Sequence, residues 1–74
     1  MTLDEVRAQY RVTEVRIVIS TVCAVFVDGD DGKPWLFAFI DDSLHSGIAF
    51  DFDREREEAF ADFKRMMLET LRYN

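Results

Sequence analysis

At the centre of the chain stands IVISTVCAVFVDGDDGKPWLFAFI, residues 17–40, in which an acidic turn separates two apolar runs. The turn contains the steps Asp28-Gly29 and Asp31-Gly32, and Asp-Gly steps between apolar runs are a strong signal for a β-hairpin. After Pro34, every side chain up to Ile40 is apolar, which is typical of a buried strand. This stretch therefore predicts two antiparallel strands at the centre of the fold.

The rest of the sheet extends outward from this hairpin. Residues 12–27 are rich in Val, Ile and Thr and predict one long first strand, with a bulge or bend near Ser20 where the apolar parity changes. Residues 41–47 are expected to form a turn, and the alternating segment 48–52 a short third strand. The sequence therefore predicts a three-stranded antiparallel meander.

Helices are predicted before and after the sheet. Thr2 and Glu5 have the spacing of a capping box, which predicts a short helix over residues 3–10. Asp53 is expected to cap a long helix over residues 54–72. The core-facing stripe of the long helix comprises Ala59, Phe60, Phe63, Met66, Met67 and Leu71. The predicted fold class is α+β in a single domain, residues 1–74: a three-stranded β-meander with a long C-terminal helix packed on one face and a short N-terminal helix.

The predicted sheet has more apolar surface than one helix covers. One face is expected to combine Trp35, Phe37 and Phe39 with Ile48, Phe50 and Phe52. The opposite face carries Leu36, Ala38 and Ile40, whereas a solvated face would be polar. Either the short N-terminal helix covers this second face, or the face or a strand edge pairs with another copy or another protein. The second alternative predicts a homodimer or a larger homo-oligomer.

Composition limits how the protein is stabilised and where it works. The 74 residues include one cysteine, Cys23, and one histidine, His45, so neither an internal disulfide nor a zinc staple is expected. The N-terminus carries acids where a secretory signal carries bases, and the apolar run 17–27 is shorter than a membrane span. We therefore expect a cytoplasmic protein without membrane contact.

Three residue groups resemble catalytic or metal sites and match none of them. The acidic turn 28–32 has Gly32 at the third ligand position of a calcium loop and lacks the closing glutamate of such a loop. The Ser, His and Asp side chains around His45 are local, whereas catalytic triads are assembled from separate loops. The carboxylates of residues 51–55 would need a pocket that perturbs their pKa values. No catalytic residue, metal or cofactor is expected, so the sequence does not predict an enzyme.

Acidic residues are concentrated in one half of the chain. Residues 28–62 contain eleven acids against three bases, in a chain with a net charge of −6. Such a field repels nucleic acid and attracts basic protein surfaces. The aromatic ladder of residues 35–39 is not expected to stack bases, because stacking platforms lie in basic grooves. The carboxylates predicted to contact a basic partner are Asp28, Asp30, Asp31, Asp51, Asp53, Glu55, Glu58 and Asp62.

These observations favour a non-enzymatic protein-interaction module. We expect an inhibitor that docks on the basic, nucleic-acid-binding surface of a larger protein without contacting nucleic acid itself. The chain is similar in kind, by its size, its charge and its lack of catalytic motifs, to phage-encoded inhibitors of host defence such as anti-CRISPR proteins. No residue motif links it to a particular such family. The alternatives are a homo-oligomeric accessory or structural subunit, and an acidic surface that serves solubility alone.

Overall fold

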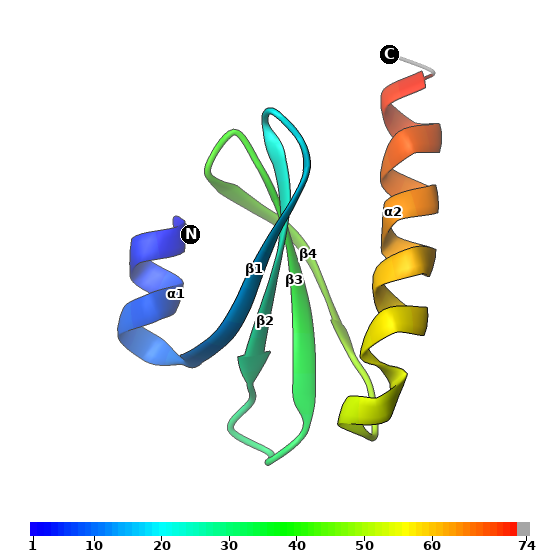
Figure 1. Ribbon diagram of the computed structural model, residues 1–74. Helices are drawn as coiled ribbons and strands as arrows, with labels where there is room; N and C mark the ends of the chain where they lie inside the picture. Colours follow the sequence, from blue (N-terminus) through cyan, green and yellow to red (C-terminus); the bar gives the residue numbers. More distant parts are fainter. Residues whose placement is uncertain (73–74) are drawn as a thin grey trace.

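The computed structural model describes residues 1–72, which form an antiparallel sheet with one helix on each side (Figure 1). Consecutive strands are neighbours, in the order β1-β2-β3-β4. The elements are α1 (Leu3–Gln9), β1 (Arg11–Ile19), β2 (Val22–Asp28), β3 (Pro34–Ile40), β4 (Ser43–Ala49), the 3-10 turn η1 (Asp53–Glu55) and α2 (Arg56–Arg72). The predicted α+β class with an antiparallel meander and a C-terminal helix is confirmed, but the described sheet has four strands rather than three.

The long first strand predicted over residues 12–27 is wrong, because the chain reverses direction at Ser20 and Thr21. Ile19 pairs with Val22, so β1 and β2 form a tight hairpin. A two-residue reversal and a bulge both change the parity of the apolar positions along the chain, so the parity change alone does not distinguish them. The extra strand of the sheet arises from this turn.

The turn between β3 and β4 is also shorter than expected. Asp41 and Asp42 have positive φ angles of 51° and 61°, a left-handed conformation that Asp tolerates better than most residues. Two such residues close a hairpin directly. β4 therefore spans Ser43–Ala49, whereas the sequence suggested a turn over 41–47 and a strand over 48–52.

Because β4 begins earlier than predicted, its side chains lie on the opposite faces of the sheet from those that the sequence suggested. Ile48 pairs with Leu36 rather than with an aromatic residue of β3, so these two side chains share a face. α2 covers this face, where Leu36 and Ala38 are 0% and 1% exposed and Ile40 packs at the margin. The predicted oligomer face of Leu36, Ala38 and Ile40 is thus occupied within the chain, which corrects its assignment as an open surface.

The core beneath α2 combines buried side chains of β2 and β3 with Phe50, which follows β4, and with two residues of the helix. Phe63 and Met67 are buried on the sheet-facing side of α2, as the predicted stripe requires. Met66 is 52% exposed and so lies outside that stripe, and the side chain of Leu71 lies outside the described residues. The buried members of this core are Val22, Ala24, Phe26, Leu36, Ala38, Phe50, Phe63 and Met67.

The opposite face of the sheet packs against α1. Val6 is fully buried there, and the ring of Tyr10 meets Phe37 edge to face with 5.5 Å between centroids. The predicted capping box is confirmed: Thr2 Oγ1 accepts from the Glu5 amide at 3.3 Å, and Glu5 Oε1 accepts from the Thr2 amide at 3.0 Å. The buried members of this second core are Val6, Val25, Val27, Phe37 and Phe39.

The start of the long helix differs from its prediction. α2 begins at Arg56, after the 3-10 turn η1, so Asp53 does not cap it as expected. Glu55 instead organises the corner, since its Oε2 accepts from the amides of Asp51 and Phe52 at 3.1 and 3.3 Å. Within residues 1–72, no helix combines the length and the apolar character needed to cross a membrane.

Candidate acidic interaction surface

Two acidic segments that are distant in sequence meet at one end of the sheet. The β2–β3 turn, residues 29–33, lies beside the chain that leaves β4 (Figure 1). The Phe50 amide donates to the Pro34 carbonyl at 3.0 Å, and Lys33 Nζ lies 3.3 Å from Asp51 Oδ1. We call Asp28, Asp30, Asp31 and Asp51 the sheet-end cluster.

Hydrogen bonds within the β2–β3 turn hold its carboxylates at the surface. The Gly29 amide donates to the Lys33 carbonyl at 2.8 Å, and Gly32, with a φ of 78°, supplies the left-handed residue that the turn needs. Asp31 Oδ1 accepts from the Lys33 amide at 3.0 Å and from Trp35 Nε1 at 3.4 Å. The hydrogen bond from the Lys33 amide lowers the pKa of Asp31, so this carboxyl stays ionised.

The predicted acidic residues differ in how far internal bases neutralise them. Four of them lie beside a basic side chain: Asp28 by Arg11, Asp51 by Lys33, Asp53 by Arg56, and Asp62 by Arg65. Among residues 1–70, whose side chains the structure describes, the side chains of Asp30 and Glu58 form neither a hydrogen bond nor an ion pair. Exposed ion pairs are weak and readily exchanged for others. The least compensated charges are therefore those of Asp30 and Glu58. Asp31 and Glu55 pair with no base among residues 1–70 but accept hydrogen bonds from within the chain.

The remaining predicted acids lie along the start of α2 rather than at the sheet end. Glu55, Glu58 and Asp62 line a shallow groove of about 280 Å³ together with Ile48 and Phe50. Asp53 belongs to neither group, because it pairs with Arg56 on the side of α2 that faces β1. The eight predicted residues thus do not form a single patch. They comprise the sheet-end cluster, the three acids that line the groove beside α2, and Asp53, which pairs with Arg56.

The most highly connected polar group in the protein was missed by the sequence analysis. Arg16 of β1 binds Glu57, and Arg56 of α2 binds Glu14 at 2.9 Å. Both guanidinium groups stack on the ring of Phe26, at 5.1 and 4.7 Å from its centroid. In sequence, Glu14 and Arg16 look like the solvent-facing positions of a half-buried strand, so no local signal identifies their partners.

This network joins β1 to α2 electrostatically. Hydrogen bonds to Glu57 and Glu14 raise the pKa of Arg16, and the hydrogen bond from Arg16 lowers the pKa of each of the two carboxyls. Partial burial opposes the charge of Arg56, but hydrogen bonds to Asp53 and Glu14 outweigh it and raise its pKa. The network lies at the edge of the core between β1 and α2, and each of its charged groups is paired with a group of opposite charge.

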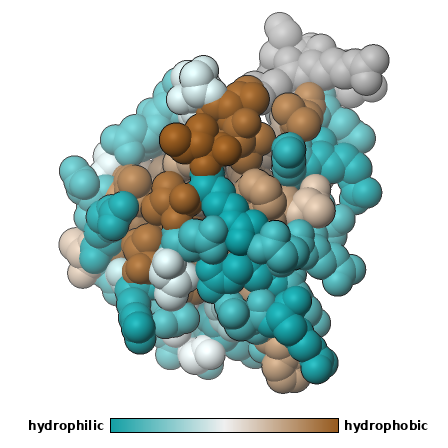
Figure 2. Space-filling model, in the orientation of Figure 1, coloured by the Kyte–Doolittle hydropathy of each residue, from teal (hydrophilic) through white to brown (hydrophobic). Residues whose placement is uncertain are grey.

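An apolar surface remains uncovered on β1. Val15, Ile17 and Ile19 are 38%, 76% and 40% exposed, and Figure 2 shows hydrophobic side chains gathered at the surface in the upper part of that view. α1 is only seven residues long and does not extend over this part of the sheet. The half-buried Cys23 lies beside the patch, and burial raises the pKa of its thiol. We call Val15, Ile17 and Ile19 the β1 patch.

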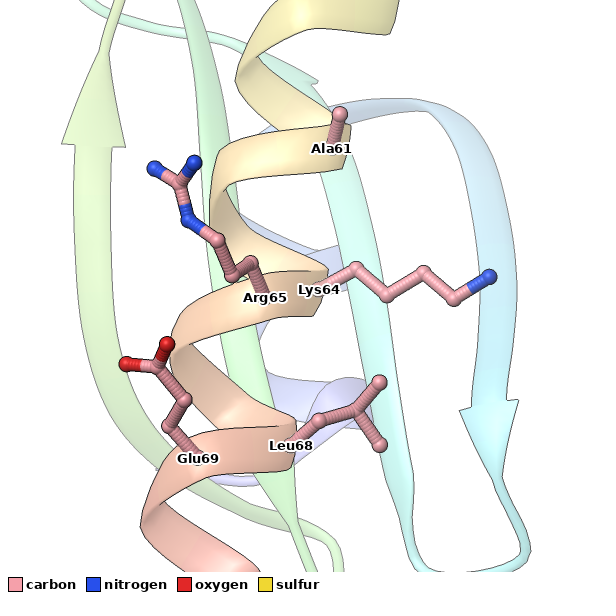
Figure 3. A pocket seen from close by; sticks show the side chains of 5 residues that line it. All are labelled: Ala61, Lys64, Arg65, Leu68 and Glu69. Carbon is pink, nitrogen blue, oxygen red and sulfur yellow. The ribbon is translucent and has the colours of Figure 1, made fainter.

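Three other local features resemble sites in the sequence or stand out in the structure. Ala61, Lys64, Arg65, Leu68 and Glu69 surround a depression on α2, but all of them project from this one helix (Figure 3). His45 Nδ1 lies 3.4 Å from Ser46 Oγ on the exposed strand β4. Within residues 1–72, no three His, Cys, Asp or Glu side chains are grouped as metal ligands. No protein-family model, curated protein or solved structure matches the chain.

Proposed function

We propose that this protein is a non-enzymatic interaction module whose acidic surfaces dock on a basic surface of a larger protein. The observation that carries the proposal is the sheet-end cluster, in which Asp51 Oδ1 is held 3.3 Å from Lys33 Nζ, beside the turn that carries Asp28, Asp30 and Asp31. Such a concentration of charge attracts a basic surface over several ångströms and orients it during approach. Asp30 and Glu58 have the greatest capacity for new ion pairs, because neither side chain has a polar partner among residues 1–70.

The finer form of the proposal concerns the partner. A basic surface that accepts spaced carboxylates is the kind of surface that binds phosphates, so we propose that the partner binds nucleic acid and is inhibited by the docked protein. This is the mode of action of an anti-CRISPR-like phage inhibitor. A cytoplasmic setting suits this partner and the single cysteine, Cys23, which has no disulfide partner in the chain.

The experiment is capture of the partner from a host lysate with tagged protein, eluted with rising salt and read by mass spectrometry. We expect a nucleic-acid-binding protein that is released at moderate salt, because exposed charge contacts are screened. Asp30→Lys and Glu58→Lys should each weaken capture. Glu69→Lys is the matched control, since it makes the same charge change on the outer surface of α2. Equal capture by all three variants would sink the proposal.

A second function is favoured by the β1 patch: assembly of two copies through the edge of the sheet. β1 is a nine-residue edge strand, and an uncovered edge with exposed aliphatic side chains is a template for pairing. An antiparallel pair centred on Val15 would place Val15 opposite Val15 of the second copy, so that the exposed aliphatic side chains of the two strands meet. This replaces the face of Leu36, Ala38 and Ile40 as the surface for a homodimer.

Sedimentation over a range of protein concentrations tests this second function. If the chain forms a dimer through β1, the wild type should show a monomer–dimer equilibrium. Ile17→Lys should abolish the dimer and leave the circular dichroism spectrum of the folded chain unchanged. Met66→Lys is the control, because Met66 is similarly exposed but lies on α2. A wild-type chain that stays monomeric at all concentrations contradicts this reading.

A further inference from the structure

A groove lined by aromatic rings adjoins the sheet-end cluster. It has a volume of about 320 Å³ and is lined by Tyr10, Gly29, Asp30, Asp31, Trp35 and Phe37. The rings of Trp35 and Phe37 lie 6.0 Å apart between centroids, and Tyr10 meets Phe37 edge to face. The groove thus combines apolar ring surfaces on its walls with two carboxylates on its rim.

Two glycines leave the space in which these rings lie. A Cβ on Gly29 would come within 2.5 Å of Trp35 Cδ1, and a Cβ on Gly47 within 2.8 Å of Phe37 Cδ1. Trp35 Nε1 also donates to Asp31 Oδ1 at 3.4 Å, which orients the indole. The shape of the groove therefore depends on the sequence at several separate positions rather than on a chance gap between side chains.

The rim of the groove carries negative charge that the chain does not neutralise. Asp31 uses Oδ1 for its internal hydrogen bonds, and its Oδ2 accepts none from residues 1–70, whose side chains are described. Asp30 has no ion pair among the described residues. The ammonium of Lys33 pairs with Asp51, 3.3 Å away, rather than with Asp30 or Asp31. A cation that enters the groove would meet ring faces and two carboxylates together.

We propose that this groove binds the guanidinium group of an arginine side chain presented by the basic partner, an inference that rests on the proposed function. A guanidinium is planar, stacks on aromatic rings and binds carboxylates through two parallel hydrogen bonds, so it suits a ring-walled groove with a carboxylate rim. The chain contains the same combination internally, where Arg56 stacks on Phe26 and binds Glu14. The groove makes one arginine the anchor of the acidic interface.

The test uses the peptide Ac-Gly-Arg-Gly-amide, with its citrulline analogue as a neutral control of equal shape. Trp35 is the single tryptophan, so its fluorescence and its indole NMR signal report directly on the groove. We expect the arginine peptide to shift the signals of Trp35, Tyr10 and Gly29, and the citrulline peptide to leave them unchanged. Asp31→Asn keeps the acceptor for Trp35 but removes the charge, and should weaken binding about tenfold.

Matched variants separate the groove from the general charge of the surface. Glu69→Gln removes one negative charge from the outer surface of α2 and should leave peptide affinity unchanged. Trp35→Leu keeps an apolar side chain without the indole and should abolish the binding seen by NMR; Asp31→Asn remains decisive if that variant does not fold. Equal shifts with arginine and citrulline, or no shift at Trp35 with either peptide, would overturn the groove as an arginine site.

Octa-arginine distinguishes failure of the groove from failure of the proposed function. If octa-arginine shifts signals around Asp51 and Glu58 but not those of Trp35, Tyr10 and Gly29, the groove proposal is wrong and the acidic docking surface stands. If octa-arginine produces no shifts in the folded protein at low salt, both proposals are wrong. Shifts at the groove that Asp31→Asn weakens support both.

Discussion

The guanidinium of Arg56 lies 2.9 Å from the carboxylate of Glu14, a residue 42 positions earlier, and stacks on Phe26 at 4.7 Å from the ring centroid. This contact links the start of α2 to β1 over the edge of the core. Arg16 of β1 makes a second link to α2 through Glu57. The orientation of α2, and therefore the position of the acidic groove of Glu55, Glu58 and Asp62, depends on both links.

Arg56→Ala is expected to lower the free energy of unfolding by about 1–2 kcal/mol, since it removes an ion pair and a ring contact from a mostly buried guanidinium. Urea denaturation followed by circular dichroism measures the change. Arg65→Ala is the control, because Arg65 is 69% exposed and its one ion pair among residues 1–70 is with Asp62, on the same helix. Equal losses in both variants would show that the network does not hold α2.

Acid should weaken the network through Glu14 and Glu57. The pKa of each carboxyl is lowered in the folded chain, mainly by the hydrogen bond from Arg16, relative to an ordinary value of 4.5. The folded state thus binds these protons less readily than the unfolded state. Their contribution to stability is complete above about pH 4.5 and is lost as the pH falls through the folded pKa values. Urea midpoints of the wild type and of Glu57→Gln, measured against pH, should converge in acid; parallel curves contradict the prediction.

Gly47→Ala should destabilise the fold by about 1–3 kcal/mol, because the added methyl would overlap the buried ring of Phe37 at 2.8 Å. Gly32→Ala provides a comparison with a different cause. There is open space around Gly32, but its φ of 78° strains an L-residue, at a cost of about 1–2 kcal/mol. If crowding causes the loss of stability in Gly47→Ala, adding Phe37→Leu should restore part of it. Adding Phe37→Leu to Gly32→Ala should restore none. Thermal or urea denaturation of the double variants measures this.

Leu36→Ala and Ile17→Ala should have very different costs, although both remove aliphatic carbons from neighbouring parts of one sheet. Leu36 is fully buried under α2, so its truncation leaves a cavity and costs about 2–5 kcal/mol. Ile17 is 76% exposed, so its truncation in the monomer stays within about 0.5 kcal/mol. Urea denaturation at low protein concentration measures both. A low cost at Leu36 would mean that α2 does not cover that face.

Local sequence patterns were sufficient for the two helices, for the central hairpin and for the sign of the charge, but not for the number of strands. The capping box of Thr2 and Glu5, the hairpin at residues 28–33 and the amphipathic positions Phe63 and Met67 all involve interactions over a few residues. Such interactions are encoded by neighbouring side chains and by periodicity, which can be recognised without the rest of the fold. The excess of acids in residues 28–62 is likewise a property of composition.

Tertiary structure decided which surfaces are open and which charges meet. The turns at Ser20-Thr21 and Asp41-Asp42 set the strand register, and a shift of one residue moves every side chain of a strand to the other face. That is why Leu36 is buried while Ile17 is exposed. The encounters of Lys33 with Asp51 and of Arg56 with Glu14 span long sequence separations, and only the closed meander brings these groups together. Sequence alone thus determined an acidic α+β protein, and packing determined the position of its acidic surfaces, because register and long-range ion pairs depend on the whole chain.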